Sequence, residues 1–288
     1  MERPAWFDES QFPFASRFVE VDGARVHHVD EGEGPVLLML HGQSAWSFLF
    51  RHLIRELRDE FRCVAIDYPG FGLSEAPPGY GFRVHEHVAV IERVVQELGL
   101  SGITPVVSNW GGPIGMAVSV RQPELVRAFV IGNTWAWPEN ATRPKILSRL
   151  LGGPVGDQLV RRLGLFSKAM SRMMQPQLTD AERAMYRGPH PTPRSREPVQ
   201  VFLRELVDAR PLLEAVEQGL EGVADRPALI VWGERDPRFG ADERRRFEQT
   251  FPDHETVVLD RAGHYLWEDA PGEIANAIRQ WSPGVTGA

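Results

Sequence analysis

The 288-residue sequence predicts an α/β fold with a mostly parallel, doubly wound sheet. Short apolar runs without alternation, which are typical of strands buried on both faces, recur along the chain. Segments with the apolar spacing of helices separate these runs. One run leads into a glycine-rich turn that opens an apolar helix. The runs are Val36–Leu40, 63–66, 103–107, 128–131 and 228–232.

The composition is that of an ordinary globular protein and excludes several classes. Hydrophobic residues make up 42% and charged residues 25% of the chain. The formal net charge of −7, with dispersed basic residues, argues against a nucleic-acid partner. The single cysteine, Cys63, excludes an intrachain disulfide. Signal-peptide and membrane-spanning patterns are absent, so we expect a cytoplasmic protein, with no metal and no cofactor.

The N-terminal part of the chain predicts a hairpin and the start of the sheet. Residues 1–16 are rich in proline and phenylalanine and are expected to lie as an arm on the surface. Residues Arg17–Val21 and 25–29 flank Asp22-Gly23, a tight-turn dipeptide, and predict a β-hairpin. Helices are expected at 47–57 and 84–98, and the strand at 63–66 leads into a loop at 67–72.

The alternation of strands and helices stops after residue 131. Residues 134–221 contain helix-like segments but no buried strand run, and we interpret them as a helical cap inserted into a core of 1–133 and 222–288. Within the cap, helices are expected at 146–151, 158–163, 168–174 and 199–206. The core then resumes with a strand at 228–232, a helix at 242–251, a strand at 256–259 and a helix at 273–281.

The turn after 103–107 has the pattern of a nucleophile elbow, a strained strand-to-helix turn that exposes one side chain. The tip residue is Asn109. Gly111 and Gly112 follow because the helix must start close against the strand. A carboxamide is not a competent nucleophile for acyl or alkyl transfer. The sequence therefore predicts a site arranged for catalysis that lacks its usual first reagent.

Two polar residues follow strands in the chain order that α/β-hydrolases use. Asp236 lies in the turn after 228–232, and His264 lies in the loop after 256–259. Asp236 would hold the imidazole in one tautomer, and His264 would activate water or a nucleophile. Taken singly, Asp236 is also compatible with a turn and His264 with a structural loop. Their shared position at strand ends favours a site.

The residues after Val36–Leu40 supply another part of the expected site. In this architecture the backbone N–H of Gln43 and that of Trp110 form an oxyanion hole. Their side chains add carboxamide and indole donors that can bind a leaving anion. The structural alternatives are a polar loop residue at 43 and a packing aromatic at 110. His41 is expected to brace the loop.

With these motifs the chain resembles the haloalkane dehalogenases of the α/β-hydrolase superfamily, over nearly its full length. The acid at Asp236, with Asn133 at the alternative acid position, resembles the branch that uses an Asp-His-Asp triad. The stretch 133–138 is most similar to the third subfamily, with Asn at the nucleophile position. The matching segments are 46–51, 67–74, 109–113, 132–138 and 263–271.

The resemblance implies an α/β-hydrolase fold and hydrolysis of a carbon–halogen bond. In that family a carboxylate at position 109 attacks the halogen-bearing carbon, and halide leaves toward Trp110 and the donor at Gln43. Water activated by His264 and Asp236 then hydrolyses the alkyl ester to an alcohol. The resemblance also implies a small apolar halogenated substrate beneath the cap. Candidate pocket residues are Phe166, Met170 and Phe202.

Two departures from the family concern the site itself. Asn109 stands where the family has Asp, and 43–45 read Gln-Ser-Ala where it usually has Asn-Pro-Thr. Removing a covalent nucleophile costs about 10⁴- to 10⁶-fold in rate, so we expect impaired activity. Three explanations are open. Asn109 is an engineered replacement, a natural feature of a protein with another role, or a side chain that His264-activated water slowly converts to Asp.

Other functional classes compete with dehalogenation. Epoxide hydrolases share the elbow and triad but need tyrosines in the cap, where only Tyr186 is available. A ligand-binding homologue would keep the pocket with a disabled tip. A carboxylesterase would need Ser or Cys at position 109. Ser108 cannot serve, because Trp110 would then occupy a position that needs a small residue. The oligomeric state and the halogen preference stay open.

Overall fold

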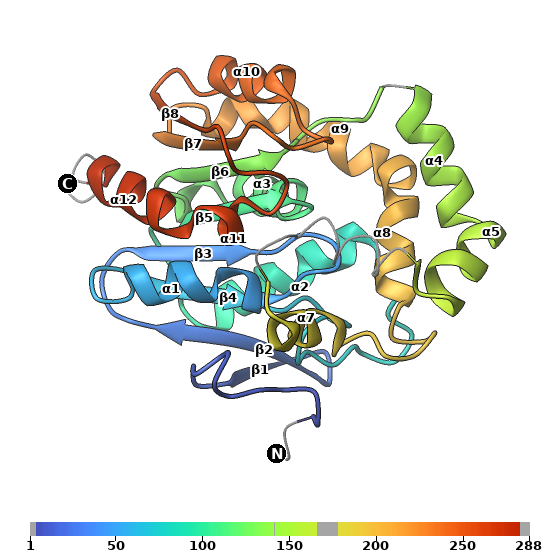
Figure 1. The fold of residues 1–288 in the computed structure, drawn as a ribbon. Helices are drawn as coiled ribbons and strands as arrows, with labels where there is room; N and C mark the ends of the chain where they lie inside the picture. The colour runs from blue at the N-terminus through green and yellow to red at the C-terminus, as the bar shows by residue number, and fades with distance from the viewer. Residues whose placement is uncertain (1–3, 141, 166–177, 283–288) are drawn as a thin grey trace.

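The computed structural model of the chain describes residues 4–140, 142–165 and 178–282. Within them, one eight-stranded sheet has helices on both faces (Figure 1). The strand order is β1-β2-β4-β3-β5-β6-β7-β8. The pairs β1–β2 and β2–β4 are antiparallel, and all other neighbours are parallel. The predicted α/β fold with a mostly parallel sheet is confirmed.

The strands form where the sequence carries its apolar and β-branched runs, and most are one or two residues longer than expected. All five residues of β3 are buried, as expected for a central strand with both faces covered. The strands are β1 (Arg17–Val21), β2 (Ala24–Glu31), β3 (Val36–Leu40), β4 (Arg62–Ile66), β5 (Thr104–Asn109), β6 (Phe129–Thr134), β7 (Ala228–Gly233) and β8 (His254–Leu259).

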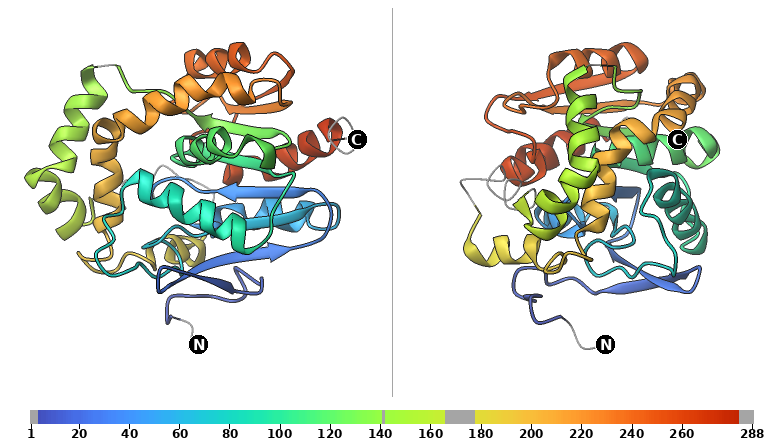
Figure 2. Two further views of the ribbon diagram at one scale, coloured as in Figure 1. Left: turned by 180° about the vertical axis from the view of Figure 1, so that it is seen from behind. Right: turned by 90° about the vertical axis from the view of Figure 1, so that its right-hand side faces the viewer.

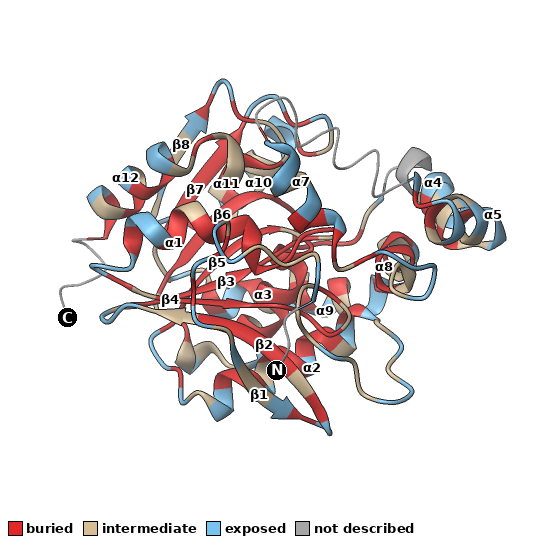
Figure 3. Cartoon of the chain, turned by 60° about the horizontal axis from the view of Figure 1, so that its bottom comes forward, coloured by how far each residue is buried: buried red, intermediate tan, exposed pale blue. Residues whose placement is uncertain are grey.

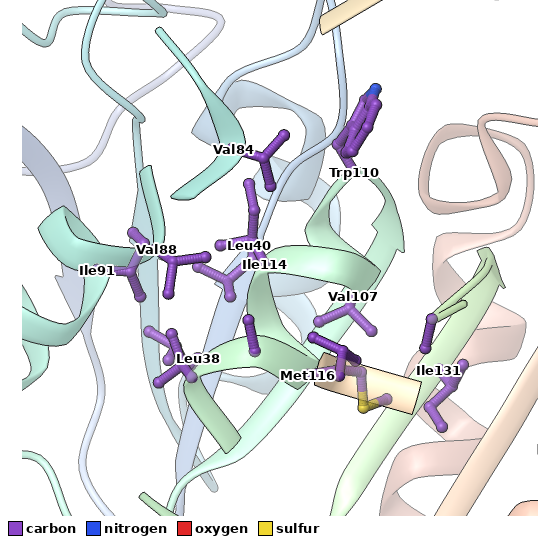
Figure 4. Packing of buried hydrophobic residues seen from close by; sticks show 14 of the residues in the cluster. Leu38, Leu40, Val84, Val88, Ile91, Val107, Trp110, Ile114, Met116 and Ile131 are labelled. Carbon is purple, nitrogen blue, oxygen red and sulfur yellow. The ribbon is translucent and has the colours of Figure 1, made fainter. Parts of the chain in front are cut away.

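Helices cover both faces of the sheet (Figure 2). Alternate residues of a strand face opposite sides, so the core is divided into two layers. Leu38 and Leu40 pack with α2, α3 and α10 in one layer, part of which Figure 4 shows. Leu37 and Met39 pack with α1 and α12 in the other. These helices are α1 (Arg51–Leu57), α2 (Val84–Glu97), α3 (Gly111–Arg121), α10 (Ala241–Thr250) and α12 (Pro271–Trp281). A 3-10 turn, η1 (Ser47–Phe50), precedes α1. In the described ranges no helix is both long and apolar enough to cross a membrane.

The N-terminal arm lies on the surface as expected, but two of its phenylalanine side chains are buried in the core. Phe12 and Phe14 are buried, and the ring of Phe12 lies 5.1 Å from that of Trp46 and 5.8 Å from that of Phe48. Burying these rings removes apolar area from water, and this holds the arm in place although it has no regular secondary structure. The hairpin that follows is confirmed, and its turn residues Asp22 and Gly23 have φ of +50° and +77°.

Between β6 and β7 the described residues form helices and no strand. Segments predicted at 146–151, 158–163 and 199–206 are helical, whereas 168–174 lies outside the described residues. The helices α7 and α9 were not predicted from the sequence, although Thr179 and Glu182 form a capping box at the start of α7. The elements are α4 (Thr142–Gly152), α5 (Pro154–Gly156), η3 (Asp157–Arg162), α7 (Asp180–Arg187), α8 (Glu197–Asp208), α9 (Arg210–Gly219) and η4 (Leu220–Val223).

A buried ionic cluster ties this helical insertion to the core. Arg51 of α1 is only 1% exposed and donates to Glu182 of α7 at 2.7 Å. It also donates to Glu268 of α11 (Leu266–Asp269), which accepts from the hydroxyl of Tyr186 as well. Burial raises the pKa of Glu268, while the Arg51 charge opposes that rise. The arginine is therefore the group that compensates two carboxylates in a poorly solvated place.

Replacing Arg51 by Met is expected to lower the free energy of unfolding by about 3–5 kcal/mol, because it leaves buried carboxylates without their cation. Equilibrium denaturation measures this loss. The matched control is Arg25→Met in the exposed Arg25–Glu75 pair, where the expected loss is at most about 1 kcal/mol. Equal losses in the two variants would show that the Arg51 cluster contributes no more than a surface ion pair.

Candidate active site

Two glycines after the elbow tip allow the backbone to pass close to the strands on either side of β5. β5 ends at Asn109, whose φ of +49° is strained for a residue with a Cβ atom. A Cβ atom at Gly111 would lie 2.0 Å from the carbonyl oxygen of Leu40. One at Gly112 would lie 1.9 Å from Oγ1 of Thr134. The helix α3 can therefore start against β3 and β6 only with glycine at both positions.

The carboxamide of Asn109 is fully engaged by the site. Its Oδ1 atom accepts hydrogen bonds from the backbone N–H of Gln43 at 3.0 Å and of Trp110 at 2.8 Å. Its Nδ2 atom lies 3.1 Å from Nε2 of His264. Both backbone groups are donors, so the oxygen must face them and the nitrogen must face the imidazole. The oxygen of Asn109 thus occupies the place of an oxyanion.

The imidazole is held by the carboxylate that the sequence analysis selected. Nδ1 of His264 lies 2.8 Å from Oδ2 of Asp236, which also accepts from Nδ2 of Asn133 at 2.9 Å. Oδ1 of Asp236 accepts from the backbone N–H of Arg238 at 2.7 Å. Burial raises the pKa of Asp236, but the hydrogen bond and charge of His264, followed by the other donors, outweigh burial and lower it overall. An ionised Asp236 fixes the proton on Nδ1, which leaves Nε2 of His264 as the acceptor facing Asn109.

Asn133 joins the ends of β6 and β7 behind this pair. Its Oδ1 atom accepts from the N–H of Gly233 at 2.7 Å, and its Nδ2 atom donates to the carbonyl oxygen of Gly233 at 2.9 Å. The same Nδ2 atom donates to Asp236. Its position at the end of a buried strand was the available sequence signal for this supporting role.

The side chain of Gln43 points to the helical insertion. Its Nε2 atom donates to the backbone carbonyl oxygen of Val199, in α8, at 2.6 Å. The backbone N–H of Gln43 therefore binds Asn109, while one hydrogen of its carboxamide binds α8. If this side chain also bound a halide, only the second hydrogen of Nε2 would be available for that contact.

An aromatic wall surrounds the indole of Trp110, which is 1% exposed. Phe202 of α8 stacks on it at 5.2 Å, and Trp135 meets it edge-on at 4.8 Å. Phe239 stacks on both Trp135, at 5.3 Å, and His264, at 5.7 Å. The structure thus brings Phe202 to the site, and it adds Trp135 and Phe239, whose roles the sequence analysis missed. The candidates Phe166 and Met170 lie outside the described residues.

The loop that carries His264 is anchored on both sides. The N–H of Gly263 donates to Oδ2 of Asp269 at 2.7 Å. The indole N–H of Trp267 donates to Oγ of Ser108 at 2.7 Å, which links this loop to the residue before the elbow tip. The Ser108 hydroxyl is thereby buried and occupied, in keeping with its exclusion as a nucleophile.

The expectation that His41 braces the loop before Gln43 is confirmed. Its Nδ1 atom donates to the carbonyl oxygen of Gly42 at 2.8 Å, and its Nε2 atom accepts from the N–H of Tyr68 at 3.2 Å. Burial lowers the pKa of His41 to about 4, so the ring is neutral and can accept at Nε2. Among the described residues, no group of three histidine, cysteine or acidic side chains could hold a metal ion.

The fold and the site together define an α/β-hydrolase. A family model described as alpha/beta hydrolase fold matches residues 35–271. The chain is 40% identical over 274 residues to haloalkane dehalogenase 2 of Mycobacterium tuberculosis, and the match covers 94% of this chain and 96% of that protein. The chain therefore belongs to the haloalkane dehalogenase family within the α/β-hydrolase superfamily.

Other similar proteins include a decarboxylase and haloalkane dehalogenases of known structure. A cis-3-alkyl-4-alkyloxetan-2-one decarboxylase of Xanthomonas campestris is 33% identical, over 89% of this chain and 92% of that protein. Among solved structures, the haloalkane dehalogenase AncHLD2 has a TM-score of 0.84 at 26% identity, over 94% of this chain and 100% of that one. DbeA of Bradyrhizobium elkani has a TM-score of 0.84 at 24% identity, over 94% and 98%, and supports the fold alone.

Proposed function

We propose that this site hydrolyses carbon–halogen bonds of small apolar compounds to alcohol and halide, and that Asn109 impairs the reaction in this chain. The observation that carries the proposal is the placement of Asn109. Its oxygen accepts from the N–H groups of Gln43 and Trp110, and its nitrogen faces His264. A nucleophilic carboxylate would need the same two contacts. The 40% identity to a haloalkane dehalogenase supports the same reaction.

In the proposed reaction a carboxylate at 109 attacks carbon, and the carbon–halogen bond breaks to release halide. The ester carbonyl oxygen then lies between the N–H groups of Gln43 and Trp110, which stabilise the charge that develops there. Nε2 of His264 takes a proton from water, and the hydroxide attacks the carbonyl carbon of the ester. The bond from that carbon to the alkyl oxygen then breaks, which releases the alcohol, restores the carboxylate at 109 and leaves one proton on His264 to pass to solvent. Asp236 stabilises the imidazolium formed in that step.

Asn109 impairs both steps. Its oxygen carries no formal charge and is a weak nucleophile toward carbon. Its Nδ2 atom donates a hydrogen bond to the lone pair on Nε2 of His264, at 3.1 Å. A water molecule must displace this hydrogen bond before His264 can activate the water. The acid at Asp236, in the turn after β7, and the stretch 133–138 support the third subfamily. We propose that residues 134–221 form a cap on a core of 1–133 and 222–288.

A panel of substrates tests the proposal. Halide release from chloro-, bromo- and iodoalkanes is compared with opening of an epoxide and decarboxylation of an alkyl oxetanone, for this chain and Asn109→Asp. The epoxide reaction is disfavoured because the hydroxyl of Tyr186 donates to Glu268. If both proteins are inactive on haloalkanes and either one opens the epoxide, decarboxylates the oxetanone or binds a ligand without turnover, dehalogenation is wrong.

Halide binding provides a further prediction. A carboxylate at 109 repels a halide held near Trp110, so Asn109→Asp is expected to weaken bromide binding at least ~10-fold. Quenching of tryptophan fluorescence by bromide measures the affinity, and Trp110→Phe identifies the component that belongs to this indole. Unchanged quenching in Asn109→Asp would count against Trp110 as a halide ligand.

The site also contains the groups needed for slow hydrolysis of the Asn109 carboxamide, once a water molecule displaces the hydrogen bond between Nδ2 and His264. Water activated by His264 adds to the amide carbon, the oxygen is stabilised by two N–H groups, and Nδ2 leaves as ammonia with a proton from His264. Intact mass is expected to rise by about 1 Da during incubation, as the amide becomes an acid. Asp236→Asn should abolish the rise. A constant mass would end this explanation of Asn109.

A further inference from the structure

Exposed apolar side chains are concentrated on one part of the insertion. Six of the seven large hydrophobic residues that are exposed in the described ranges fall between residues 146 and 165. Their exposed fractions run from 45% to 60%, whereas the seventh, Val258 of β8, is 37% exposed. The six residues are Ile146, Leu147, Leu150, Val155, Leu163 and Leu165, and we call the first three, which all lie on α4, the outer face.

The helix α4 has a polar residue on its buried side and apolar residues on its exposed side, the reverse of a usual surface helix. Its inner side packs on α8, where Oγ of the buried Ser148 donates to the carbonyl oxygen of Leu203 at 2.6 Å. Ile146, Leu147 and Leu150 lie on the opposite side, which faces solvent. Figure 3 shows α4 and α5 beyond α8, at the edge of the molecule away from the sheet. No described element covers this side of α4.

The charged residues within the segment 145–165 are mostly positive, although the whole chain carries a formal charge of −7. Lys145 and Arg149 precede Ile146 and Leu150 by one residue each, so the two cations border the apolar stripe along α4. Asp157, the acidic residue of 145–165, forms ion pairs with both Arg161 and Arg162. The segment is therefore cationic against an anionic background.

We propose that the outer face docks on an anionic lipid surface. Apolar residues flanked by lysine and arginine match the headgroup boundary, where the apolar side enters the acyl region and the cations meet the phosphates. A second copy of the chain is a poorer partner, because a two-fold contact places the same cations opposite each other. The inference rests on exposure and charge and does not depend on the reaction at Asn109.

Flotation of the purified full chain with vesicles tests the inference. The chain is expected to float with vesicles of phosphatidylcholine and phosphatidylglycerol, to stay unbound with phosphatidylcholine alone, and to be released by high salt. The double variants Leu147→Asn/Leu150→Asn and Lys145→Gln/Arg149→Gln should each lower binding at least ~10-fold. The matched control is Val258→Asn, an exposed apolar residue outside the outer face, which should bind as the parent does.

The altered residues are solvent-exposed or at the edge of α4, and circular dichroism checks that each variant folds. No binding to anionic vesicles, equal binding to both vesicle types, or binding that survives both double variants would overturn the inference. Light scattering after size-exclusion chromatography measures the oligomeric state and tests whether a second copy of the chain covers the outer face. If the parent is a dimer that Leu147→Asn/Leu150→Asn dissociates, the outer face is an interface between two copies and the lipid proposal is wrong.

Discussion

Replacing Asn109 by Asp is expected to raise the rate of halide release from a bromoalkane by about 10⁴- to 10⁶-fold, because it supplies the missing nucleophile. One carboxylate oxygen takes the place of Oδ1 between the N–H groups of Gln43 and Trp110. The other replaces Nδ2, 3.1 Å from His264, and no longer donates to the imidazole. It carries the negative charge that attacks carbon. The substitution thus supplies the nucleophile and frees Nε2 of His264 for water.

Steady-state halide release measures this gain. Intact mass must be recorded before each assay, so that any Asp formed from Asn109 during storage is not counted as activity of the parent. The matched control is Asn276→Asp on the exposed side of α12, which makes the same charge change far from the elbow and should leave the rate unchanged. A folded Asn109→Asp protein that is no faster than the parent on all three halogens would contradict the proposed reaction.

The backbone of the site is predictable from the sequence because sheet geometry and steric exclusion fix it. Asp236 and His264 each follow a strand, and strand ends of a parallel sheet share one edge, so the strand order predicts that the two residues are neighbours. In the structure Nδ1 of His264 lies 2.8 Å from Oδ2 of Asp236. The elbow is fixed by Gly111 and Gly112, where any Cβ atom would collide with β3 or β6. These are local signals with one structural solution.

Side-chain directions that depend on distant partners were not predictable. The carboxamide of Gln43 donates to a carbonyl 156 residues away, in a helix whose position relative to the sheet no local pattern gives. Phe239 stacks on His264 across two separate loops. Phe12 is buried because Trp46 and Phe48 offer it an aromatic surface, although proline-rich sequence around it predicts an exposed arm. In each case tertiary packing decides what composition leaves open.

The orientation of the Asn109 carboxamide also depends on distant partners and was not predictable from the sequence. From sequence alone, the residue reads as an absent nucleophile. The structure shows that both of its polar atoms are matched, since its oxygen accepts two N–H groups and its nitrogen faces His264. Because Asn109 pairs with both backbone N–H groups and with His264, it leaves none of these groups without a hydrogen-bond partner in a poorly solvated site. This explains how Asn109 is accommodated in an elbow arranged for a carboxylate.

In a chain that carries Asn109→Asp, replacing His264 by Gln is expected to stop the reaction after its first chemical step. The carboxylate at 109 still attacks carbon and releases one halide per chain. Glutamine can keep a hydrogen bond to Asp236 but cannot take a proton from water, so the alkyl ester persists. Multiple-turnover halide release should fall by about 10⁴-fold, while the first-turnover burst remains.

Intact mass identifies the trapped state, because the chain gains the mass of the alkyl group and loses it only slowly. His85→Gln, an exposed histidine of α2, is the matched control and should turn over normally. Loss of the burst together with turnover would mean that His264 is needed before the ester forms. Full turnover without His264 would mean that another group activates water, in which case the hydrogen bonds among Asn109, His264 and Asp236 would be structural. Accumulation of the ester distinguishes these cases. If His264 acts only in ester hydrolysis, its removal leaves ester formation intact.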